Sequence, residues 1–183
     1  ALADRPEAHL NRGVVFQNLG RPDDAEAAYR TALRLDDGFR PARFNLATLL
    51  NAQSRNVEAR KVLDRLVGDD PNDGEARYSR ALLLAETGDV KGAVVDLRVA
   101  AEAFPDRARI AYNLGLAEIQ LGRVDAGRTA LLRAHQAEPR DPDIVFALST
   151  VERDAGNRAG AIHWAERLIQ LRPEDPGARR YLQ

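Results

Sequence analysis

The chain of 183 residues carries 27 basic and 28 acidic side chains, so it lacks the strong positive field with which proteins bind nucleic acids or acidic membrane surfaces. It contains no cysteine, which excludes disulfides, thiolate metal ligands, cysteine nucleophiles and covalent haem attachment within this chain. Its longest apolar runs, such as residues 81–85, are far shorter than the about 20 residues of a membrane-spanning helix.

The first predicted helix begins at Pro6, because proline suits the first turn of a helix. It ends at Gly20, since glycine favours the left-handed position that follows a helix. Asp23 and Asp24 are expected to cap a second helix, whose apolar residues recur at the helical spacings of three and four. Residues 1–5 match the end of a preceding second helix, and methionine is absent, so we expect a fragment of a longer protein.

The same pair of helices recurs every 34 residues, in repeats at 6–39, 40–73, 74–107, 108–141 and 142–175, with 176–183 as a partial sixth helix. Small residues hold the eighth and twentieth places of each repeat: Gly13, Ala25, Ala47, Ala59, Ala81, Ala93, Gly115, Gly127, Ser149 and Ala161. Glycine holds the fifteenth place, except in the second repeat: Gly20, Ser54, Gly88, Gly122 and Gly156. A fixed period of this length predicts a single repeat array over 1–183.

The small residues have a mechanical role in each helix pair. Gly115 on a first helix and Gly127 on the following second helix allow two backbones to approach closely, and a bulky side chain at either place would push them apart. One such pair cannot bury its apolar faces alone, so neighbouring repeats must stack.

Together with Ala32, Ala100 and Ala134 at the twenty-seventh place and proline at the thirty-second, this pattern resembles the tetratricopeptide repeat family. The resemblance covers 6–175 and implies an all-α fold: a right-handed α-solenoid of five helix–turn–helix repeats plus the partial sixth helix. It also implies a non-enzymatic scaffold for protein binding, and we expect a bacterial source. The eleventh place, usually aromatic in the family, holds Glu118 and Glu152, which predicts looser or partly polar packing in those repeats.

No set of residues in the sequence predicts catalysis, a metal site or a cofactor. The histidines fall in different repeats and at different places within them, so we expect no cluster: His9, His135 and His163. Glu118 and Glu152 are equivalent carboxylates in adjacent repeats, but general acid–base chemistry needs a pocket that nothing else suggests. Partly solvated or arginine-paired glutamates are the favoured interpretation. Residues 69–74 resemble a calcium loop only superficially, because Pro71 occupies a required ligand place.

The candidate binding surface is a second stripe along the first helices, which lines the concave groove in the family. Amides there can bond to a peptide backbone, and the aromatic and aliphatic neighbours supply anchoring area. The row of asparagines resembles the ladder in the repeat domain of O-linked N-acetylglucosamine transferases, with interruptions at Ser79 and Ala147. An alternative is that the aromatic row is simply half-buried between stacked helices. The predicted groove residues are Leu10, Asn11, Phe44, Asn45, Tyr78, Leu82, Tyr112, Asn113, Leu116 and Phe146.

The charges along this stripe are mixed, and the basic clamp with which some members of the family hold acidic chaperone tails is absent. We therefore expect a protein or peptide partner of neutral or mixed charge, and neither nucleic acid nor membrane.

Two alternatives stay open. The chain can be a docking or regulatory module of a larger enzyme, since its opening residues resemble repeat modules of bacterial multihaem cytochrome-like proteins. It can also self-assemble into a homo-oligomer through exposed solenoid ends, where Trp164, Leu168 and Leu171 are expected to be incompletely covered. The sequence predicts a soluble protein and leaves its compartment, cytoplasmic or periplasmic, open.

Overall fold

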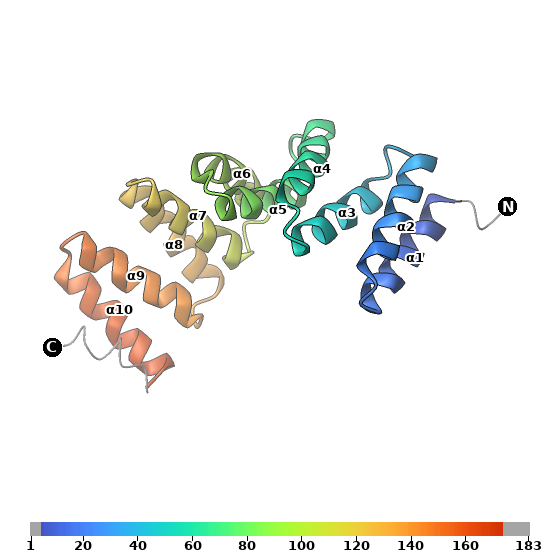
Figure 1. The fold of residues 1–183 in the computed structure, drawn as a ribbon. Helices are drawn as coiled ribbons and strands as arrows, with labels where there is room; N and C mark the ends of the chain where they lie inside the picture. Colours follow the sequence, from blue (N-terminus) through green and yellow to red (C-terminus); the bar gives the residue numbers. More distant parts are fainter. Residues whose placement is uncertain (1–4, 174–183) are drawn as a thin grey trace. The chain divides into compact units, whose positions relative to one another are not determined.

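The structure, a computed structural model, describes residues 5–173, which form ten α-helices and no strand (Figure 1). The predicted all-α solenoid of helical repeats is confirmed, whereas the predicted partial helix at 176–183 lies outside the described residues. The helices are α1 (Pro6–Asn18), α2 (Pro22–Leu35), α3 (Arg40–Ala52), α4 (Asn56–Asp69), α5 (Gly74–Glu86), α6 (Val90–Ala103), α7 (Ala108–Gln120), α8 (Val124–Ala137), α9 (Pro142–Asp154) and α10 (Arg158–Leu171).

The chain divides into two compact units, Ala1–Thr87 and Gly88–Gln183, hereafter unit 1 and unit 2. Unit 1 contains α1 to α5, and unit 2 contains α6 to α10. The division falls inside the third predicted repeat, at the turn between its two helices. Within each unit, successive helices pack against their neighbours in the chain, as in α1 with α2 and in α7 with α8. The single array over 1–183 stays a prediction.

The turn between the two helices of a repeat has the predicted left-handed residue. Gly122 has a φ of 75°, and Ser54, in the one repeat that lacks glycine there, has a φ of 59°. A side chain in this conformation costs roughly 1–2 kcal/mol, so the second repeat carries local strain. The predicted caps at Asp23 and Asp24 are wrong, because α2 begins one residue earlier, at Pro22, and its N-cap residue Arg21 makes no side-chain cap hydrogen bond.

The close approach predicted for Gly115 and Gly127 occurs between α7 and α8. A Cβ atom built on Gly127 would lie 2.8 Å from the carbonyl oxygen of Gly115 and 2.5 Å from Cγ1 of Ile119. Backbone cannot move aside as a side chain can, so this pair sets the spacing of the two helices. Leu131, which is fully buried on α8, packs directly over Gly115.

Each unit has its own apolar core. In unit 1 it centres on Tyr29, Leu46 and Leu50, and in unit 2 on Leu131 and Leu148. Among the described helices, none is long and apolar enough to cross a lipid bilayer.

Candidate functional site

Three of the predicted groove residues come together in unit 2. Tyr112 and Leu116 on α7 and Phe146 on α9 line one pocket of about 230 Å³, which we call the α7–α9 pocket. Leu116 is 41% exposed and Phe146 44% exposed, so apolar side chains face solvent there although apolar groups usually turn inward. The rest of the lining consists of Ile119, Val124, Ala147, Thr150, Val151 and Asp154. The pocket is therefore mostly apolar, and the polar side chains in its lining are Tyr112, Thr150 and Asp154.

Charged side chains border this pocket, and they are paired with one another. The guanidinium of Arg109 lies over the Tyr112 ring, 5.0 Å from its centroid, and its Nη2 is 3.4 Å from Oδ2 of Asp141. Arg153 forms an ion pair of 2.7 Å with Asp154. Burial, and then the nearby carboxylate of Asp143, raises the pKa of Tyr112, so its hydroxyl stays protonated and can donate a hydrogen bond at neutral pH.

The groove residues predicted in unit 1 divide into two kinds. Leu82 lines a pocket of about 150 Å³ together with Ser79, Thr48 and Asn51. Leu10 and Phe44 are instead half-buried and pack against the core of unit 1. These two residues agree with the alternative interpretation, in which the row is half-buried between stacked helices. Tyr78 is also half-buried on α5.

The predicted asparagines differ in their surroundings. Asn11 is exposed on α1, and Asn113 follows Tyr112 on α7 without lining the α7–α9 pocket. Asn45 hydrogen-bonds the hydroxyl of Tyr29, a fully buried residue whose pKa is raised by that burial. The same hydroxyl donates to Oε1 of Gln17 at 2.9 Å. Asn45 thus contributes to the core of unit 1, a role that sequence reasoning missed.

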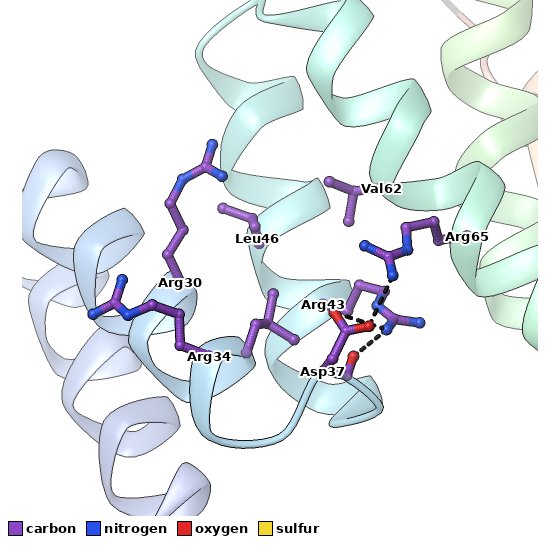
Figure 2. A pocket seen from close by; sticks show the side chains of 8 residues that line it. Arg30, Arg34, Asp37, Arg43, Leu46, Val62 and Arg65 are labelled. Carbon is purple, nitrogen blue, oxygen red and sulfur yellow. Dashed lines mark hydrogen bonds and ion pairs between the residues drawn. The ribbon is translucent and has the colours of Figure 1, made fainter.

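A further pocket, of about 400 Å³, was not predicted from the sequence (Figure 2). It lies in unit 1 among α2, α3, α4 and the turn between α2 and α3, on different residues from the predicted groove. We call it the arginine pocket, because four of the eight residues that line it are arginines. Its lining is Arg30, Leu33, Arg34, Asp37, Arg43, Leu46, Val62 and Arg65.

The two equivalent glutamates are paired with cations, as favoured from the sequence. Glu118 is 2% exposed, and its Oε1 accepts hydrogen bonds from Arg98 at 2.5 and 3.1 Å. Its Oε2 accepts from Arg123 at 3.2 Å. Glu152 accepts a hydrogen bond from Asn157 at 2.8 Å and lies 2.9 Å from Nε of Arg128. Both carboxylates join neighbouring helices and need no catalytic role.

Two of the three histidines contact the same indole ring. His135 on α8 and His163 on α10 both contact the Trp164 ring edge-on, with centroids 4.9 and 5.0 Å from it. Burial, then the positive charges of Arg167 and His163, lowers the pKa of His135. No group of metal-ligating side chains occurs within the part of the chain that the structure describes.

Comparison with known families now accounts for this architecture. Sequence profiles described as tetratricopeptide repeat match residues 18–83 and, in two overlapping stretches, 78–143 and 112–179. The chain belongs to the tetratricopeptide repeat family. Repeats of this family generally mediate protein–protein interaction and are generally not enzymes, although one distant relative of this tetratricopeptide repeat chain is a transferase.

Curated relatives of this tetratricopeptide repeat chain are much longer than the chain itself. It is 28% identical over 175 residues to cellulose synthase operon protein C of Xanthomonas axonopodis pv. citri, a match that covers 91% of the chain and 12% of the relative. It is 26% identical over 183 residues to the human protein O-mannosyl-transferase TMTC3, covering 91% of the chain and 19% of that protein. The chain thus spans less than a fifth of the length of these two relatives.

Solved structures share the fold of this chain, among them a tetratricopeptide repeat protein. YrrB, described as having an unusual peptide-binding site, superposes with a TM-score of 0.85 at 17% identity and covers 97% of this chain and 91% of its own. MamA from Desulfovibrio magneticus RS-1 superposes with a TM-score of 0.85 at 21% identity, covering 96% of this chain and 99% of its own. At these identities the likeness concerns the fold alone.

Proposed function

We propose that this tetratricopeptide repeat chain is a non-enzymatic scaffold that binds a peptide segment of a partner protein, and that the α7–α9 pocket anchors an apolar side chain of that segment. The observation that carries the proposal is the exposure of Leu116 and Phe146 beside a concave apolar wall. Exposed apolar side chains around a pocket mark interaction sites more often than scattered single ones do.

The polar groups at the border fit a peptide better than a small apolar ligand. The hydroxyls of Tyr112 and Thr150 are in or beside the apolar wall, where a peptide backbone offers both donors and acceptors. Arg109 and Arg153 are each next to a carboxylate, so the border has no strong net charge. This supports a segment of neutral or mixed charge.

The chain offers a matched pair of leucines for the test. Leu116 lines the α7–α9 pocket and is 41% exposed, whereas Leu132 on α8 of the same unit is 38% exposed and does not line it. Peptides selected from a random phage-displayed library against the whole chain would be titrated by fluorescence anisotropy into the parent, Leu116→Glu and Leu132→Glu proteins. We expect Leu116→Glu to weaken binding by about tenfold or more and Leu132→Glu to leave it unchanged. Equal affinities for all three proteins would overturn the assignment of the pocket.

The length of the relatives favours a second role, that of a docking module within a longer protein, because the chain spans only 12% and 19% of two of them. The coding sequence around the chain tests this role. An adjoining catalytic domain supports it, and start and stop codons flush with the chain contradict it. Leu168, which was expected to be incompletely covered, is fully buried. Self-association through the ends of the array stays a prediction, which sedimentation velocity at several concentrations would test.

A further inference from the structure

The arginine pocket combines an apolar floor with cationic walls. Leu46 of α3 lies between a wall from α2, which carries Arg30 and Arg34, and a wall from α4, which carries Val62 and Arg65 (Figure 2). Its lining contains four guanidinium groups and a single carboxylate, that of Asp37. The lining therefore has an excess of positive charge around an apolar surface.

Most of these arginines are held in place by acceptors of the protein itself. Arg43 is 5% exposed and is held by the main-chain carbonyl of Asp37 and by the carboxylate of Asp69. Arg65 donates to Oδ2 of Asp37 at 2.8 Å, so the turn between α2 and α3 is joined to both α3 and α4. These contacts fix the shape of one side of the pocket without a ligand.

Arg34 differs from the other three. Arg30 is paired with Glu26 at 2.7 Å and lies 3.4 Å from Glu58. The guanidinium of Arg34, in contrast, donates to the hydroxyl of Thr31 at 2.7 Å, and over residues 5–173 no carboxylate is within ion-pairing distance of it. Arg34 is thus an exposed cation at the pocket whose positive charge is not neutralised by a carboxylate of residues 5–173.

The pocket is not a general feature of this repeat. Val62 stands at the twenty-third place of its repeat, and the same place in the fifth repeat holds Trp164. The Trp164 ring reaches from α10 to His135 on α8, and His135 stands at the place that Leu33 holds in the first repeat. An indole thus extends from α10 to α8, whereas a valine stands at the same place on α4, beside the pocket between α4 and α2.

We propose that the arginine pocket binds an acidic segment of a partner protein, with a leucine or similar apolar side chain on the floor beside Leu46 and a neighbouring Glu or Asp side chain paired with Arg34. A carboxylate matches the fork of guanidinium donors, and such pairs gain strength where an apolar surface excludes water. An apolar neighbour adds buried area that a free ion lacks. This site is separate from the α7–α9 pocket, and its test is independent of the proposed function.

The probe is a fluorescein-labelled peptide with the core Glu-Leu-Glu, flanked by Gly and Ser and amidated at its C-terminus, so that, apart from the dye that every probe carries, side chains supply its only carboxylates. Three companions have the cores Gln-Leu-Gln, Glu-Ser-Glu and, with a free C-terminus, Gln-Leu-Gln again. Anisotropy titrations into the whole chain at low and physiological ionic strength are expected to rank Glu-Leu-Glu above all three companions, with weaker binding at the higher salt. No binding of Glu-Leu-Glu, or equal or tighter binding of any companion, would overturn the proposal.

Two variants locate the site. Arg34→Glu reverses the charge without breaking an ion pair and is expected to weaken Glu-Leu-Glu binding by about tenfold or more. Val62→Trp fills the pocket as Trp164 does in the fifth repeat and is expected to abolish binding, with helicity checked by circular dichroism. Arg133→Glu, at an exposed arginine on α8 of unit 2, is the matched charge control and is expected to keep the parent affinity. Unchanged binding by Arg34→Glu, or an equal loss in Arg133→Glu, would contradict the assignment whether or not Val62→Trp folds.

Discussion

The buried carboxylate of Glu118 gives the sharpest prediction about stability, because removing its arginine partners and removing the carboxylate itself should have different effects on the free energy of unfolding. The carboxylate is 2% exposed, whereas the side chains of its partners Arg98 and Arg123 are 55% and 50% exposed. Removing both cations by Arg98→Ala/Arg123→Ala leaves a carboxylate buried and unpaired. We expect the free energy of unfolding to fall by about 3 kcal/mol, the lower end of the range for such a break, because water can enter where the arginines stood.

Removing the carboxylate should cost much less. In Glu118→Leu the half-exposed arginines return to solvent, and the desolvation of the carboxylate is no longer required. Leucine already stands at this place in the second and third repeats, as Leu50 and Leu84, so its shape suits the site. We expect a stability within about 1 kcal/mol of the parent, or higher.

Urea unfolding followed by far-UV circular dichroism measures both effects, with Arg133→Ala as a surface control expected to change stability by less than about 0.5 kcal/mol. The reasoning is refuted if Glu118→Leu loses more stability than the double arginine variant. In that case the carboxylate would contribute through an interaction other than these two ion pairs.

Three further predictions concern packing, the turns and pH. Gly127→Ala should lower the free energy of unfolding by about 1–3 kcal/mol, because its Cβ would lie 2.8 Å from a backbone oxygen. Gly68→Ala on α4, where no atom lies within 4 Å of an added Cβ, should raise the free energy of unfolding by about 0.5 kcal/mol. Changes of the same sign for both variants in urea unfolding would contradict this. Ser54→Gly should raise stability by about 1 kcal/mol, since it relieves a φ of 59°; a lower melting temperature would count against local strain in that turn. The pKa of His135 lies below its ordinary value of 6.5, so the unfolded chain takes up this proton at a higher pH than the folded chain. The contribution of the neutral His135 side chain to folding stability is therefore complete above pH 6.5 and is lost as pH falls through the lowered pKa. His135→Leu should reduce that loss in thermal melts between about pH 8 and pH 5, and an unchanged pH dependence would refute the contribution.

The helices and turns could be predicted because their signals are local. Glycine after a first helix and proline at the start of the next act through their own backbone angles, so Gly122 and Pro142 mark boundaries that need no knowledge of packing. The cap of α2 was misplaced since Pro22 starts the helix one residue before the aspartates expected to cap it.

The residues of a binding site could be predicted only where they lie on the same face of equivalent helices. Tyr112, Leu116 and Phe146 share a helical stripe that recurs between repeats, and the structure places them at one pocket. The arginine pocket depends on side chains from three helices, none of which is unusual alone. Its signal in the sequence was the contrast between Val62 and Trp164 at one place of the repeat. The same stacking brings His135 to Trp164, a contact between different places of adjacent repeats.

The most direct test of peptide binding at unit 2 is a nitrogen-15 chemical-shift titration of the whole chain with a peptide selected from the random library. If the α7–α9 pocket anchors an apolar side chain, the largest shifts will fall on the amides of Leu116, Phe146 and their neighbours on α7 and α9, and Leu116→Glu will raise the peptide concentration at their midpoint by about tenfold or more. Saturating shifts confined to α8 and α10, or to unit 1, would contradict the account.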